Sequence, residues 1–213
     1  VRAVGVRAIY PVLDLNLNPV WAVDHDSWAL NPGCYQLKAA LVWLEVPGMA
    51  QQYHQALAAA VFGQKIFLSV SGDALIDRLH SYCYFLEGLM PMVSTSRVLF
   101  LGALEPIETI LRAEHPFERS DVCAQWLRIR LYLDRLGLTL LPSGWLDSYL
   151  DRLLTFQACA EDPRIDGGFY FGKREGHTIA HVNPVSTVFA IQAMEMVRQY
   201  REERLIPDWS LLI

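Results

Sequence analysis

The sequence predicts an all-α fold of stacked helical hairpins in a single domain. Segments with helical spacing of apolar residues follow one another along almost the whole chain, and the alternation typical of strands is almost absent. Helices that are apolar nearly all round also alternate with ordinary amphipathic helices. This alternation indicates hairpins in which one helix of each pair faces inward.

The predicted helices follow from periodicity and from capping signals, such as the Asn-Pro pairs at 31–32 and 183–184. Residues 1–31 are mostly irregular. A long Gly-rich loop covers 162–182 and precedes the last helix. The predicted helices cover 33–46, 49–62, 73–92, 96–113, 121–136, 145–160 and 185–201.

Composition limits the classes of function. The 213 residues are 53% hydrophobic, which is enough for one sizeable core. A net charge of -5 without a Lys/Arg cluster argues against nucleic-acid binding, and no apolar run is long enough for a membrane span. The expectation of a small-molecule partner comes instead from the polar residues of the predicted inner helices.

The cysteines lack the paired spacing of a zinc site. All four fall within helical patterns, so we expect buried free thiols in a cytoplasmic protein, with no metal and no cofactor. They are Cys34, Cys83, Cys123 and Cys159.

The helix over 73–92 carries one narrow stripe of polar residues, while its other faces are apolar. Unpaired buried charge is expensive, so this stripe is expected to face a polar cleft or other polar groups. The stripe consists of Asp73, Asp77, His80, Tyr84 and Glu87.

The helix over 121–136 repeats this pattern with Asp121, Gln125, Arg128, Tyr132 and Arg135. The first inner helix adds Tyr35 and Lys38 as candidate binding residues. In a partly dry cleft, Glu87 and His80 are candidates for proton transfer, and Arg128 for holding an anion. The alternative is that the stripes form a buried salt-bridge network.

Two loops carry further candidates. Asp24 and Asp26 flank His25 before the first inner helix, where they form a metal site, the acid/base pair of a sugar enzyme, or a solvated capping loop. The Gly-rich loop carries Asp166 and Phe169, and His181 follows them. This loop either covers a cleft with an aromatic platform or fills the top of the core with its aromatic side chains.

The segment Gly167-Gly168-Phe169, followed by HVNPVSTVFA at 181–190, resembles the α/α-toroid superfamily. Terpenoid cyclases, prenyltransferase β subunits, six-hairpin glycosidases and sugar epimerases share this architecture. The predicted helices of this chain would form about four hairpin pairs. Because a complete ring has six, the chain is either an incomplete ring or the C-terminal part of a longer protein. The acidic DxDD motif of cyclases and the prenyltransferase zinc set are missing.

Together, the resemblance and the stripes predict a carbohydrate-active toroid protein, either a glycoside hydrolase or a sugar epimerase. Glu87 would be the acid or base, with His80 beside it and Asp24, Asp26 or Asp166 as the opposing carboxylate. The remaining stripe and loop candidates would hold a sugar or polyol. The alternatives are an isoprenoid cyclase or prenyltransferase relative, and a non-catalytic interaction module with a protein partner on its open flank.

Overall fold

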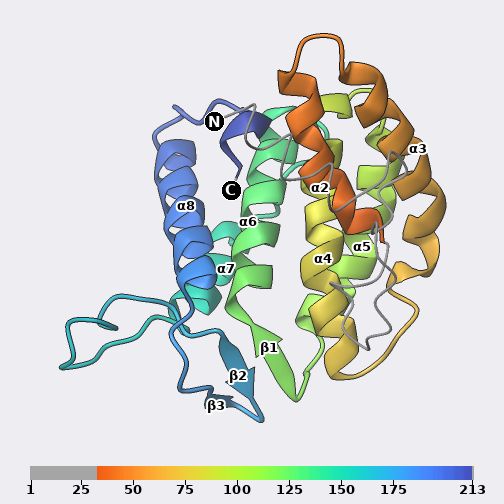
Figure 1. Ribbon diagram of the computed structural model, residues 1–213. Coiled ribbons are helices and arrows are strands. Elements are labelled where there is room, and N and C mark those ends of the chain that lie inside the picture. The colour runs from red at the N-terminus through yellow and green to blue at the C-terminus, as the bar shows by residue number, and fades with distance from the viewer. Residues whose placement is uncertain (1–32, 213) are drawn as a thin grey trace. The chain divides into compact units, whose positions relative to one another are not determined.

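The computed structural model describes residues 33–212. Within them the protein is 62% helical, with seven helices and one small antiparallel sheet of three strands (Figure 1). The predicted helical character is therefore confirmed, and the small sheet is an addition that the sequence did not indicate. No helix in the described part is long and apolar enough to cross a bilayer.

The described chain forms two compact units. The first contains 33–71 and Ser81–Ser96, and the second contains Gly72–His80 and 97–212. Helix α4 (Asp73–Leu89) contributes its first half to the second unit and its second half to the first.

The first unit contains the second half of α4 and the helices that precede α4 in the chain. Besides α4, its elements are η2 (Cys34–Gln36), α2 (Leu37–Ala40), η3 (Leu41–Glu45), α3 (Ala50–Phe67) and η4 (Met90–Met92). The segment predicted as one helix over 33–46 is thus a short α-helix between two 3-10 segments. Helix α3 continues past Gly63, because one glycine costs a helix only about 1 kcal/mol.

The second unit holds the remaining helices and the sheet. Its elements are α5 (Arg97–Arg112), β1 (Phe117–Arg119), α6 (Ser120–Arg135), α7 (Trp145–Leu154), β2 (Gly172–Arg174), β3 (His177–Thr178), α8 (Pro184–Arg201) and η5 (Trp209–Leu211). Every residue of α6 from Ser120 to Leu133 is buried, as predicted for an inner helix. Helices α6 and α8 lie side by side (Figure 1).

The sheet joins the start of α6 to the Gly-rich loop. Strand β1 pairs antiparallel with β2, so that Glu118 lies opposite Lys173 and Arg119 opposite Gly172. A Cβ at Gly172 would lie 2.1 Å from the carbonyl oxygen of Glu118, so the close approach requires glycine. Strands of two or three residues are too short to show an alternating pattern, which is why the sequence did not predict them.

The ends of two helices bound the Gly-rich loop. Helix α7 ends at Leu154 rather than at 160, because the chain after it pairs with the loop: Ala158 N donates to Gly168 O at 2.7 Å. At the other end, the predicted cap of α8 is confirmed. The Asn183 side chain accepts hydrogen bonds from the backbone N–H groups of Val185 and Ser186.

Candidate functional site

Part of the predicted polar stripe meets inside the second unit. His80 Nδ1 of α4 lies 2.7 Å from Gln125 Oε1 of α6, and 3.7 Å from Asp121 Oδ2. All three residues are buried. The structure therefore brings these sequence-predicted residues together, but it packs them against one another.

Arg119, which the sequence analysis did not select, holds this cluster from the end of β1. Its Nε and Nη2 donate to the two Asp121 oxygens at 2.9 and 2.7 Å, and its Nη1 donates to Asp77 Oδ1 at 2.7 Å. Burial alone would raise the pKa of Asp121, but attraction to His80 and Arg119 outweighs it, and the pKa lies below its usual value. Asp121 is therefore an ionised, paired carboxylate.

The side chain of Arg128 contacts two side chains of α8. Its side chain is fully buried, and its guanidinium carbon lies 4.3 Å from the centre of the Phe189 ring. Nη1 also donates a hydrogen bond to Gln192 Oε1. The group predicted to bind a ligand anion thus has its contacts within the protein.

Glu87 belongs to the first unit and is also buried, with an exposure of 0%. Its Oε2 lies 3.1 Å from Lys38 Nζ, so two predicted site residues form an ion pair. Tyr84 and Tyr35 of the same unit are half-buried, and burial raises the pKa of Tyr35 to about 12. His80, the other predicted candidate for proton transfer, belongs to the second unit.

The candidate residues of the Gly-rich loop differ in burial and do not form one site. Phe169 is buried and its backbone N–H donates to Thr187 Oγ1 at 2.9 Å, which ties the loop to α8. A Cβ at Gly168 would lie 2.6 Å from a Val182 methyl carbon, so this close packing requires glycine. Asp166 and His181 are exposed.

The Asp166 carboxylate binds a backbone group nearby in the chain: its Oδ1 accepts a hydrogen bond from Ala160 N at 3.1 Å. Phe169 therefore fills the core, which is the alternative that the sequence left open for this loop. The other two candidate carboxylates, Asp24 and Asp26, lie outside the described residues.

A buried carboxylate that the sequence analysis missed lies on α5. Glu108 Oε1 accepts hydrogen bonds from Arg130 at 2.8 Å, Trp126 at 2.9 Å and Trp145 at 3.0 Å. Its Oε2 accepts from Tyr149 at 2.7 Å and from Arg112 at 3.3 Å.

The signal for this cluster was present in the sequence, because Glu108 follows Ile107 and falls on the apolar face of α5 together with Phe100 and Leu111. A single acid on an apolar face requires buried donors. The carboxylate joins three helices and has its lone pairs occupied, so its position is that of a structural group.

A groove with a volume of about 490 Å³ lies between the end of α5, α7 and β2. Its charged lining consists of three cations and two carboxylates: Arg112, Arg152, Lys173, Glu114 and Glu118. The volume falls within the usual range for small-molecule sites, roughly 300–1,000 Å³. Tertiary pairing builds this groove, since Lys173 reaches it from β2, and no pattern along the sequence indicated it.

The remaining lining of the groove is aromatic and hydroxylic. Trp145 and Tyr149 stack with their ring centroids 4.2 Å apart, and both are largely buried beneath the groove. Ser148 and Thr155 add hydroxyl groups. The groove thus offers donors, acceptors and a partly aromatic wall in one place.

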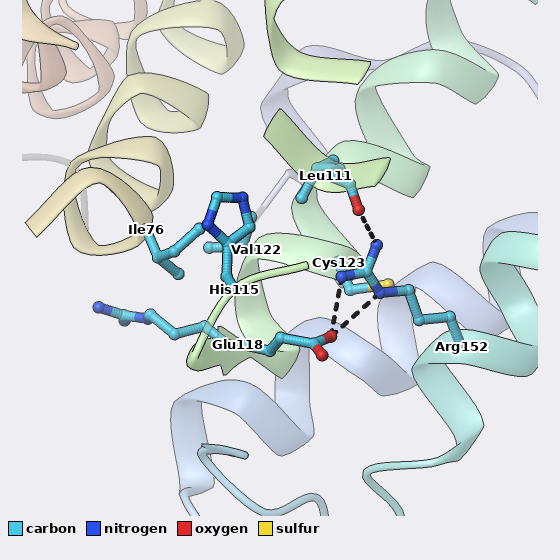
Figure 2. Close-up of a pocket in the computed structure, with 8 residues that line it drawn as sticks. Ile76, Leu111, His115, Glu118, Val122, Cys123 and Arg152 are labelled. Atoms are coloured by element: carbon cyan, nitrogen blue, oxygen red, sulfur yellow. Dashed lines mark hydrogen bonds and ion pairs between the residues drawn. The ribbon is translucent and has the colours of Figure 1, made fainter. Parts of the chain in front are cut away.

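A small hollow adjoins the groove, and Arg152 and Glu118 line both (Figure 2). Arg152 donates to the Leu111 carbonyl, and its Nη2 donates to Glu118 Oε2 at 2.8 Å. His115 and Ile76 lie on the other side of the hollow (Figure 2). Its volume of about 10 Å³ gives room for about one water molecule, so it is no site for a sugar.

The cysteines follow the expectation except at one position. Cys34, Cys83 and Cys123 are buried free thiols, and burial raises the pKa of Cys34 and Cys123 to about 12. Cys159 is exposed and lies outside any helix, because α7 ends five residues before it. The prediction that Cys159 is a buried helical thiol is therefore wrong.

Among the described side chains, no group of three or more His, Cys, Asp or Glu residues is placed to hold a metal ion. Comparison of the chain with family models, curated proteins and solved structures finds no match.

Proposed function

We propose that this protein binds a small polyol-type ligand such as a sugar, and that the ligand occupies the groove between α5, α7 and β2. The observation that carries the proposal is the contrast in exposure between two polar regions. The predicted stripe residues Gln125 and Arg128 have an exposure of 0%, whereas the groove is open and has charged and hydroxyl groups in a mixed polar and apolar lining. A ligand reaches an open groove without disrupting the core.

The lining of the groove suits hydroxyl groups. A sugar hydroxyl both donates and accepts, so it pairs well with a wall that mixes cations, carboxylates and hydroxyls. Arg152 and Glu118 are fixed by their mutual ion pair, and Ser148 lies on the exposed side of α7. Such fixed groups reduce the ordering cost of binding.

The proposal keeps the ligand class predicted from the sequence and changes the place of binding. Catalysis by Glu87 and His80 remains the competing hypothesis. The buried ion pair between Glu87 and Lys38 supports a structural role for that carboxylate instead.

The toroid architecture is part of the same proposal. We infer that α6 and α8 are inner helices of stacked hairpins, because α6 is buried over fourteen consecutive residues and packs along α8. The ligand groove then lies on the outer helix α7 and on the sheet beside it, rather than in a central cleft.

The proposal is tested by thermal shift and calorimetric titration with neutral mono- and disaccharides. The variant Ser148→Trp places a large side chain in the groove, and Asp147→Trp is the matched control on α7, outside the groove lining. A sugar that binds the folded state raises the melting temperature. We expect this rise in wild type and Asp147→Trp, and its loss in Ser148→Trp.

Two outcomes contradict the proposal. An unchanged response in Ser148→Trp together with an altered response in Glu87→Gln would place binding at the predicted stripe. No response to any sugar, with self-association that Ile191→Glu abolishes, would favour the interaction module. Ile191 belongs to an exposed apolar row on α8 with Val185 and Val188.

A further inference from the structure

We infer that the ligand of the groove carries a negative charge, as a sugar acid or a sugar phosphate does, and that Lys173 and Arg112 hold its oxyanion. This inference rests on the proposed function, because it names the chemical class of ligand for the same groove.

Lys173 has an ammonium group without a carboxylate partner. Its Nζ donates to Thr155 Oγ1 at 2.7 Å and lies 4.7 Å from the centre of the Phe156 ring. Glu118 is opposite Lys173 on the neighbouring strand, yet its carboxylate pairs with Arg152 instead. Within the described residues no carboxylate lies within ion-pair distance of Lys173, and an ammonium has three donors to offer.

Arg152 contributes little free charge to the groove. Its Nη1 donates to the Leu111 carbonyl, while its Nε and Nη2 both donate to Glu118. The ion pair of Arg152 and Glu118 is therefore neutral overall and forms a fixed wall.

Arg112 is the second available cation. Its side chain is 68% exposed, and its Nη2 lies 3.3 Å from Glu108 Oε2. Glu108 is already neutralised by Arg130 at 2.8 Å. The exposed guanidinium of Arg112 therefore belongs to the groove lining, together with the exposed carboxylate of Glu114.

The lining thus has three cations against two carboxylates, on a protein whose formal net charge is -5. A local excess of positive charge on an acidic protein favours an anionic ligand over a neutral one. The ammonium of Lys173 serves as a point charge, and the planar guanidinium of Arg112 can pair with two oxygens. Carboxylate and phosphate share this oxyanion chemistry.

The test is calorimetric titration of glucose, glucuronate, glucose 6-phosphate and inorganic phosphate at low and high salt. The variants are Lys173→Met and Arg112→Gln, with Arg201→Gln as a control for the loss of one exposed cation on α8. We expect the charged sugars to bind wild type about tenfold or more tightly than glucose, because hydrogen bonds to charged groups are the stronger ones. Lys173→Met should remove most of this advantage, weakening the charged sugars far more than glucose, and salt should weaken the charged ligands more than glucose.

Equal binding of glucose and glucuronate, or an unchanged charge preference in Lys173→Met, overturns the inference. The proposed function survives that result if glucose still binds and Ser148→Trp still blocks it. Inorganic phosphate binding as tightly as glucose 6-phosphate, and weakened by Lys173→Met, supports the oxyanion site but removes the sugar from the proposed function. Circular dichroism of each variant shows whether the fold is retained.

Discussion

The polar side chains of α6 and those of the groove beside α7 are chemically alike, yet their surroundings differ. On α6, Arg119 occupies both oxygens of Asp121, and Gln192 and Phe189 hold Arg128. In the groove, Lys173 has a hydroxyl and a ring as neighbours but no acid. A row of polar residues therefore indicates a ligand-binding site only where its charged groups are not already paired within the protein.

Glu108 and Asp121 extend this comparison to two buried carboxylates. Both receive charged donors from arginine, and Glu108 also receives two indole N–H groups and a phenol. A buried carboxylate is stable when all of its oxygen lone pairs accept hydrogen bonds. Removal of one member of such an ion pair lowers the free energy of unfolding strongly, because the other charge stays buried. Substitutions in the two regions should therefore affect different properties.

The largest effect is expected from Glu108→Ala. Arg130 would stay buried without its carboxylate, so the free energy of unfolding should fall by about 3–5 kcal/mol. Urea unfolding followed by tryptophan fluorescence measures this loss. Glu108→Gln keeps the shape and should lose less, and Glu195→Ala on the surface of α8 should cause no measurable change. A loss as small as that of Glu195→Ala would show that the cluster is not a structural centre.

Asp121→Asn should have the next largest effect, a loss of about 2 kcal/mol, because Arg119 keeps Asp77 as a partner. The lowered pKa of Asp121 also sets the pH dependence. Its stabilisation is complete above the pKa of an unfolded aspartate, about 3.9, and is lost as the pH falls through the lower pKa of the folded state.

The stability difference between wild type and Asp121→Asn should therefore shrink below about pH 4. Urea unfolding at a series of pH values measures it. A difference that grows with acidification would contradict the ionised, paired state of Asp121.

The smallest expected effect is on the rate at which the thiols react, and the free energy of unfolding should not change. Only Cys159 should react quickly with a thiol reagent in the folded protein, because burial keeps Cys123 protonated with a pKa of about 12. Counting reactive thiols before and after unfolding checks this, and Cys159→Ser should abolish the fast reaction. Fast labelling of Cys123 would show that the hollow beside the groove opens.

Local patterns were sufficient for most of the helices but not for the charged groups. The buried character of α6 and the Asn183 cap of α8 depend on neighbours along the chain, so the sequence predicted both correctly. The partners of Asp121 were harder to predict, because Arg119 lies on the strand before the helix and outside its stripe. A polar stripe indicates burial of charge and does not identify the partner.

The sequence by itself determined the helical class of this protein, the positions of its main helices and the placing of polar residues on buried faces. These features follow from periodicity and capping, which act over a few residues. The tertiary structure alone decided that Glu108 becomes the hub of four donor side chains from α6 and α7. It also decided that Lys173 enters a groove beside α7, because the pairing of β1 with β2 joins segments more than fifty residues apart.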